Sequence, residues 1–143
     1  MPHPVTSEDR EPERHVGYLI RRAQQRHVAL WAETVSTEIT SVQYAALAVL
    51  DRSDASQREL GDAVDLDRST IADLVARMER RGLVERRRSS TDARRNAVSL
   101  TGFGRAERLR LRPAVETLQE RLTAGLDAAE LDGLVRGLHA LLR

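Results

Sequence analysis

The sequence predicts a mainly α-helical protein that carries one short, strongly basic β-hairpin. Three observations predict this fold class. Apolar residues recur at helical spacing, capping-box pairs mark several helix starts, and one arginine-rich stretch contains two strand-like runs around a turn. Aromatic residues make up only 3% of the 143 residues, so the core must consist of aliphatic side chains, which suits helix packing. The length corresponds to one domain.

The first helices follow a polar N-terminal arm. Residues 1–12 hold the early prolines and many charges without an apolar period, so we expect a flexible arm. One long helix should then occupy residues 13–35. Two further helices should begin at capping boxes, in which a side chain and a backbone N–H satisfy each other reciprocally. These capping boxes are Thr40 with Gln43 and Ser56 with Glu59.

The fourth helix buries one side and exposes polar groups at its start. Asp67 is its expected N-cap, after a turn at residues 64–66. A core-facing stripe with i, i+3, i+4, i+7 spacing consists of Ile71, Leu74, Val75 and Met78. The exposed first turn consists of Arg68, Ser69 and Thr70. Such a turn can enter a major groove and contact base edges, although an ordinary amphipathic helix shows the same pattern.

Positive charge is concentrated directly after this helix. The whole chain has a net charge of +1, and all 23 of its basic residues are arginine, which can pair bidentately with phosphate or guanine. Residues 77–95 alone hold eight arginines and three acidic residues, a net charge of +5. Gly82 should end the helix, and residues 83–86 and 96–100 should form two short strands. A basic hairpin in this position predicts a winged helix-turn-helix, whose wing reaches the DNA backbone or the minor groove.

The expected partner is therefore double-stranded DNA. Contacts should come from the start of the helix before the turn, from the exposed face of the fourth helix, and from the wing. The predicted DNA-binding residues are Ser56, Gln57, Arg68, Ser69, Thr70, Arg77, Arg88, Arg94 and Arg95. The rival class is a protein-interaction module with the same fold, but such a module has no use for eight clustered arginines.

The wing resembles that of the MarR family of transcriptional regulators. The family's pattern is Asp-x-Arg followed by Leu-Thr-x-x-Gly, and here it consists of Asp92, Arg94, Leu100, Thr101 and Gly104. The resemblance covers nearly the whole chain. It implies a homodimeric repressor on a pseudo-palindromic operator, with Arg94 at the minor groove or its phosphates. It also implies one domain over residues 13–143, with a DNA-binding lobe at about 40–101 and dimerisation helices at about 13–35 and 102–143.

Two long helices follow the wing. Thr101 should cap the first, over residues 102–124, and Pro113 should kink it. The second opens with a capping box at residue 127 and carries an apolar stripe over residues 131–142. One copy would leave that stripe poorly covered, so we expect a two-fold dimer that places two DNA-reading helices about 34 Å apart. Closure of a monomeric core by these helices is the alternative.

The helix at residues 13–35 mixes arginine, histidine and the only tryptophan. Arg21 and Trp31 lie near one another around the helix axis, and His27 shares an apolar stripe. This segment resembles the first helix of MarR members that respond to aromatic carboxylic acids. The resemblance implies a small-molecule effector, with Arg21 on its carboxylate, His27 on a ring hydroxyl and Trp31 packed against the ring. Alternatively, Arg21 pairs with a protein acid, His27 is a core histidine and Trp31 anchors the dimer.

Other functional classes find little support. The absence of cysteine excludes a disulfide framework, a thiol redox switch and a Cys-based zinc site. The sequence contains no HExxH, phosphate-loop or Gly-x-Ser-x-Gly motif, and its four histidines are scattered, so we expect no enzyme activity, no cofactor and no metal site. A metal-responsive regulator stays an alternative. No apolar run approaches the ~20 residues of a membrane span, so we expect a cytoplasmic protein without a membrane partner.

Overall fold

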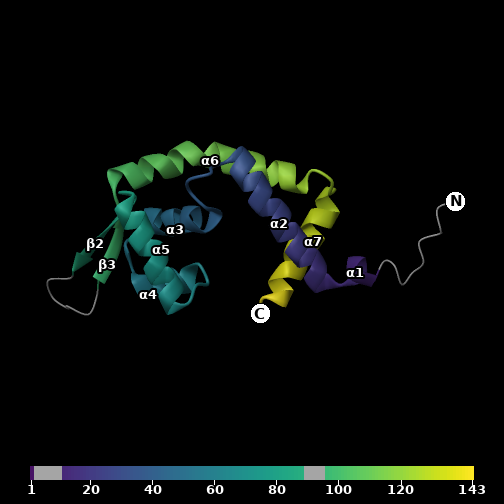
Figure 1. Cartoon of the computed structure of the whole chain (residues 1–143), viewed down its shortest axis with the longest axis horizontal. Coiled ribbons are helices and arrows are strands. Elements are labelled where there is room, and N and C mark those ends of the chain that lie inside the picture. The colour runs from purple at the N-terminus through teal and green to yellow at the C-terminus, as the bar shows by residue number, and fades with distance from the viewer. Residues whose placement is uncertain (2–10, 89–95) are drawn as a thin grey trace. The chain divides into compact units, whose positions relative to one another are not determined.

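The computed structural model describes Met1, residues 11–88 and residues 96–143, and it is mainly helical over these ranges (Figure 1). In chain order its elements are α1 (Glu11–Arg14), α2 (Val16–Thr34), α3 (Ser41–Arg52), β1 (Ala55–Ser56), α4 (Gln57–Ala63), α5 (Arg68–Arg80), β2 (Val84–Arg88), β3 (Asn96–Leu100), α6 (Gly102–Thr123) and α7 (Ala128–Leu141). The mainly α-helical winged helix-turn-helix predicted from the sequence is thereby confirmed.

The chain divides into two compact units. The central unit, residues 36–115, holds α3, α4, α5, the strands and the first part of α6. The terminal unit combines residues 1–35 with 116–143 and holds α1, α2, the end of α6 and α7. The chain passes between them twice, once after Val35 and once within α6, shortly after Pro113. The helix continues through this proline, and a bend there stays a prediction.

The helices of the central unit begin where the sequence predicts, because local hydrogen bonds fix their starts. Thr40 Oγ1 accepts the Gln43 N–H at 3.1 Å, and Gln43 Oε1 accepts the Thr40 N–H at 3.1 Å. Ser56 and Glu59 form the same reciprocal pair. Replacement of such a cap by alanine typically costs about 1 kcal/mol.

The hairpin is part of a three-stranded antiparallel sheet. β2 and β3 pair along their whole length, with Val84 opposite Leu100 and Arg88 opposite Asn96. The two-residue β1 pairs with the other edge of β3, with Ala55 opposite Val98, so the strand order is β1-β3-β2. This strand was not predicted from the sequence, because two residues carry no periodicity and their partners lie far along the chain.

The core of the central unit includes the inner face of α5. Ile71, Val75 and Met78 are almost completely buried, while Leu74 is half-buried at the edge of the predicted stripe. Full burial of side chains of this size contributes about 1.5–3 kcal/mol each. Other fully buried side chains of this unit are Ile39, Leu47, Leu60, Leu83, Val98 and Leu111.

In the terminal unit, the predicted single helix over residues 13–35 is interrupted. His15 has extended backbone angles (φ −80°, ψ 118°), so it separates the one-turn α1 from α2. A single extended residue leaves the apolar spacing from Val16 onward unchanged, so periodicity could not indicate the break. Within this unit Arg121 ties α6 to α2 through the Thr34 hydroxyl at 2.7 Å and the Glu33 carboxylate at 3.0 Å.

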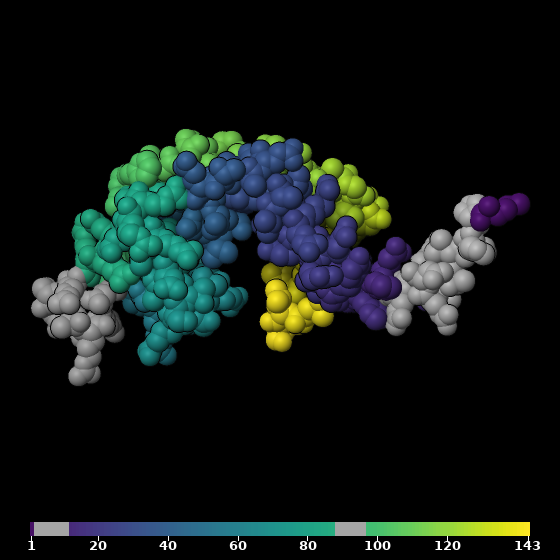
Figure 2. Space-filling model, viewed as in Figure 1, coloured from purple at the N-terminus to yellow at the C-terminus, as the bar shows by residue number. Residues whose placement is uncertain are grey.

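The last helix, α7, exposes its apolar stripe. It begins at the predicted capping box, where Asp127 Oδ1 accepts the Glu130 N–H at 2.8 Å. None of its residues is buried, and Leu134, Val135 and Leu138 are 46%, 45% and 40% exposed. In the space-filling view α7 forms part of the protein surface (Figure 2, yellow). No helix in the described ranges is long and apolar enough to cross a membrane.

Candidate nucleic-acid interface

The helix pair α4 and α5 is closely packed at its turn. A Cβ at Gly61 would lie 3.1 Å from the Leu66 carbonyl oxygen and 3.2 Å from Ile71 Cγ2, so α4 approaches the turn and α5 closely enough that an added side chain would require its neighbours to shift. Asp65 has φ 54°, in the left-handed region that aspartate tolerates better than most residues. The predicted turn at residues 64–66 is therefore present, and it sets the start of α5.

Asp67 organises the first turn of α5. Its Oδ1 accepts the Thr70 N–H at 2.7 Å, as the predicted N-cap requires, and also the Ser69 hydroxyl at 3.1 Å. Hydrogen bonds from Thr70 and then from Ser69 lower the pKa of Asp67 below its usual value. The carboxylate is therefore ionised at neutral pH and can only accept hydrogen bonds. Arg68, Ser69 and Thr70 are all exposed, as expected of a turn that contacts DNA.

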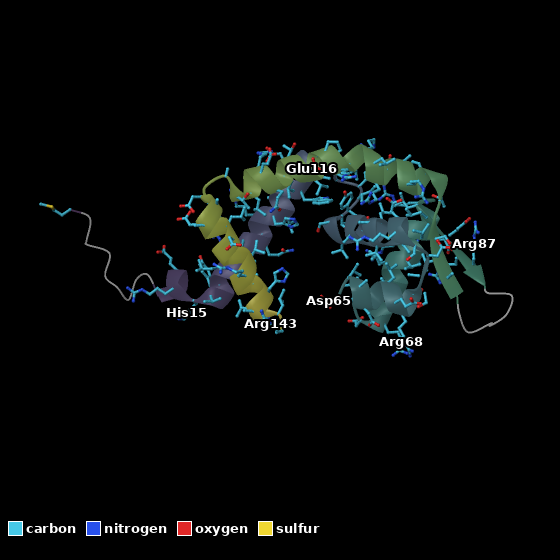
Figure 3. All side chains as sticks on the ribbon, turned by 180° about the vertical axis from the view of Figure 1, so that it is seen from behind. His15, Asp65, Arg68, Arg87, Glu116 and Arg143 are labelled. Carbon is cyan, nitrogen blue, oxygen red and sulfur yellow. The ribbon has the colours of Figure 1, made fainter. Side chains whose placement is uncertain are left out.

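The side chain of Arg68 points away from the protein at the start of α5 (Figure 3). It borders a surface depression between the starts of α4 and α5, which also includes Gln57 and Arg58. The remaining residues that line this depression are Gly61, Asp62, Leu66, Asp67 and Ile71. Arg58 was not among the predicted DNA-binding residues, although its place beside Gln57 in the first turn of α4 indicates the same surface. Ser56 forms the cap of α4 and also pairs with Ala97 in β3.

The arginines after α5 form ion pairs with nearby acids. Arg86 Nε lies 3.8 Å from a Glu79 carboxylate oxygen, and Arg87 binds Glu85 at 2.6 Å. Glu85 raises the pKa of Arg87. These pairs are at the surface, where ion pairs contribute at most about 1 kcal/mol, so a phosphate can readily replace the acid. Figure 3 shows Arg87 pointing outward from β2.

The remaining arginines that the sequence predicts as DNA contacts lie at different places along this segment. Arg77 is exposed on α5. Arg88 closes β2 opposite Asn96. Arg94 and Arg95, like Asp92, lie outside the described residues. Arg81 is held away from the wing, because its guanidinium donates to the backbone carbonyl of Glu38 and lies 3.4 Å from the Glu38 carboxylate.

The base of the wing is joined to α6 by the residues of the Leu-Thr-x-x-Gly pattern. Thr101 Oγ1 accepts the Gly104 N–H at 2.9 Å and so caps α6 as predicted, while its hydroxyl donates to the Gly82 carbonyl. Gly82 has φ 74°, the left-handed conformation expected of a glycine that ends a helix. The Thr101 N–H binds the Leu83 carbonyl at 3.2 Å. The end of α5 and the start of α6 are thus fixed to each other at the two strands.

Partly buried ion pairs connect α3 with α6 in the central unit. Asp51 binds Arg108 at 2.8 Å through one carboxylate oxygen and Arg105 through the other. The Arg108 side chain is only 19% exposed, and its Nε is buried without a hydrogen-bond partner among the described residues. This pair was not predicted, because the partners lie more than 50 residues apart in the sequence.

The structure brings together only two of the three predicted effector residues. His27 and Trp31 lie one helical turn apart, with ring centroids separated by 6.1 Å. Trp31 is only 7% exposed and His27 is half-buried. Arg21 is exposed instead, with its guanidinium 5.6 Å from the centre of the Tyr18 ring. Arg21 is about 15 Å from Trp31 along the helix axis, because each residue adds about 1.5 Å. In the described ranges no group of three His, Asp or Glu residues could hold a metal ion.

The exposed first turn of α5, the helix pair behind it and the basic hairpin beside it define a winged helix-turn-helix protein that binds DNA. Comparison with known proteins gives the family. Residues 37–95 match the model of the MarR family. The chain is 34% identical to the HTH-type transcriptional repressor NicR of Pseudomonas putida over 117 residues, which cover 80% of this chain and 74% of NicR. It therefore belongs to the MarR family, and it is a DNA-binding transcriptional regulator.

Solved structures agree with this assignment. The PcaV transcriptional regulator from Streptomyces coelicolor, in complex with its natural ligand, has a TM-score of 0.88 and 38% identity, over 92% of this chain and 94% of PcaV. BpsR of Bordetella bronchiseptica has a TM-score of 0.82 and 31% identity, over 90% of this chain and 98% of BpsR. The BpsR structure concerns regulation of DNA binding by 6-hydroxynicotinic acid.

Proposed function

We propose that this regulator is a homodimeric repressor, which a small aromatic carboxylic acid releases from a pseudo-palindromic operator. The observation that carries the proposal is its similarity to BpsR, whose DNA binding is regulated by 6-hydroxynicotinic acid, a hydroxylated aromatic acid. The names of NicR, a repressor, and of PcaV, bound to its natural ligand, support the same function. The protein would carry out no reaction of its own. Because its target is chromosomal DNA, we place it in the cytoplasm.

Dimerisation would cover the apolar stripe of α7. MarR proteins are dimers. Leu134, Val135 and Leu138 are each 40% or more exposed in one copy, and Leu141 is 60% exposed. A second copy related by a two-fold axis would bury this stripe, and it would double the number of DNA contacts. The two-fold symmetry is also the reason why the operator should be pseudo-palindromic.

In the proposed effector site, Arg21 binds the carboxylate and His27 binds the ring hydroxyl. Arg21 is an exposed cation that already lies against the Tyr18 ring, so it combines a bidentate donor with an aromatic surface. His27 follows about 9 Å further along the axis of α2, a separation that a single-ring acid and two side chains can span together. Trp31, which is buried against His27, would orient the imidazole and would not touch the ring of the acid.

Release of the operator requires a large but attainable contribution from the binding free energy of the acid. To shift an operator from about 99% to about 1% occupancy, the acid must favour the released state by about 5.5 kcal/mol. Two equivalent sites in a dimer would each supply about half of this free energy. A bidentate arginine–carboxylate pair and the burial of one ring are interactions of that order.

The test is release of a fluorescent operator duplex by a series of acids. The series contains benzoate, 4-hydroxybenzoate, nicotinate, 6-hydroxynicotinate and cinnamate. Arg21→Ala should bind the operator as wild type does but should no longer respond to the acids. Arg22→Ala is the matched control, because Arg22 is exposed on the same helix but points elsewhere, and it should respond normally. The proposal fails if no acid releases the wild type, or if Arg21→Ala responds like the control.

A further inference from the structure

Hydrogen bonding within the first turn of α5 fixes which kind of base Ser69 can contact. Ser69 is exposed, and its hydroxyl oxygen lies 3.1 Å from Asp67 Oδ1. A hydroxyl has one proton to donate and two lone pairs that accept. What Ser69 can offer to a base therefore depends on whether its own proton is used in the bond with Asp67.

The proton comes from Ser69. The same Asp67 oxygen accepts the Thr70 N–H at 2.7 Å, and the two neighbours lower the pKa of the carboxyl. An ionised carboxylate has no proton to give, so the serine must donate. A hydrogen bond to an ionised acceptor is also stronger than a neutral one, so an incoming neutral base does not easily redirect the hydroxyl. Toward solvent, Ser69 therefore presents only lone pairs.

We propose that Ser69 determines operator specificity as an obligate hydrogen-bond acceptor, which selects adenine or cytosine at one position of each half-site. The proposal rests on DNA binding through α5. In the major groove the amino groups that donate are N6 of adenine and N4 of cytosine. Guanine O6 and N7, thymine O4 and the phosphate oxygens are all acceptors, and Ser69 has nothing to donate to them.

Asp67 acts as a positioning residue in this arrangement. It does not touch DNA, but it holds the hydroxyl of Ser69 in one orientation. Its negative charge also lies where a phosphate would otherwise bind the free N–H groups of the helix start, so it favours a base edge over the backbone at this point. The remaining alternative is that Ser69 only supports the cap and contacts no base.

The experiment is selection of binding sites from a randomised duplex library by the full-length protein. Wild type should enrich adenine or cytosine at one position per half-site, and Ser69→Ala should become indifferent at that position alone. From the strength of one neutral hydrogen bond, the lost preference should be roughly threefold to tenfold. Ser69→Thr keeps the hydroxyl and is the matched control. Affinity for random DNA should be equal in all three proteins.

Two further measurements separate the roles of Ser69 and Asp67. If adenine is selected, an operator with unsubstituted purine at that position lacks the amino group and should weaken wild type but not Ser69→Ala. Asp67→Ser keeps a good N-cap but removes the charge, so the freed Ser69 hydroxyl should now also tolerate guanine or thymine. A wild-type preference for guanine or thymine, or no change in Ser69→Ala, would overturn the proposal. An unaltered preference in Asp67→Ser would remove Asp67 from it.

Discussion

Replacement of Gly104 by alanine should disrupt the junction between the wing and α6. Gly104 is buried in the first turn of α6. A Cβ at this position would lie 2.0 Å from the carbonyl oxygen of Leu83 and 2.9 Å from its carbonyl carbon. Both are backbone atoms, and the same carbonyl accepts the Thr101 N–H at 3.2 Å. No rotation of a side chain can relieve this overlap, so the backbone of the wing or of α6 must move.

The size of the expected destabilisation follows from the kind of atom that the added Cβ would meet. Overpacking typically costs about 1–3 kcal/mol, and an overlap with fixed backbone belongs at the upper end. We therefore expect Gly104→Ala to lower the free energy of unfolding by about 3 kcal/mol, and the melting temperature by about 10 °C. Gly102→Ala is the matched control, because nothing lies within 4 Å of its added Cβ. In a helix this change should be neutral or stabilise by up to about 1 kcal/mol.

The assay is thermal and urea unfolding followed by circular dichroism. All variants must be compared at one protein concentration, because the melting temperature of a dimer depends on concentration. A melting temperature of Gly104→Ala close to that of wild type would refute the steric argument. If Gly102→Ala destabilised the protein as much as Gly104→Ala, the start of α6 would tolerate alanine at neither position. The overlap with Leu83 would then not be the cause of the lost stability.

Three other perturbations test the interface and its support. Arg94→Ala should weaken operator binding without unfolding the protein, and should flatten the slope of log affinity against log salt by roughly one unit in a titration from low to moderate salt. Asp51→Ala should leave the guanidinium of Arg108 partly buried without its carboxylate and lower stability by about 1–3 kcal/mol, whereas Asp51→Glu should restore part of the loss in the same melts. Because the folded pKa of Asp67 is lowered, its cap contributes fully above the unfolded pKa, and this contribution is lost as pH falls through the folded pKa. Wild type should therefore lose more stability than Asp67→Ser between neutral pH and pH 3, and parallel acid titrations would contradict this.

Features that depend on neighbouring residues could be predicted from the sequence. The starts of α3, α4, α5 and α7 all follow from a side chain that caps a backbone N–H three residues later, so Thr40, Ser56, Asp67 and Asp127 mark them correctly. The buried face of α5 follows from its periodicity. The signal for the hairpin was equally local, since two strand-like runs, of which the first is rich in arginine, follow one another closely in the sequence.

Features that depend on distant residues could not be predicted. β1 exists only because β3 supplies a partner strand, and the Asp51–Arg108 pair joins residues 57 positions apart. The effector residues Arg21, His27 and Trp31 stay a prediction. Arg21 and Trp31 are about 15 Å apart along α2, a separation that their angle around the helix axis does not indicate.

The double role of Ser56 has a consequence for signalling. This residue pairs with β3, the central strand of the sheet, and also caps α4, so one residue joins the sheet to the helix pair. We therefore expect the hairpin base and the first turn of α5 to meet the DNA together, as one piece of the central unit. If this piece keeps its shape, its relative affinities for different base sequences stay the same, whatever fraction of the protein is bound to DNA. We therefore expect an inducing acid to change the yield of a binding-site selection and to leave the recovered sequence logo unchanged.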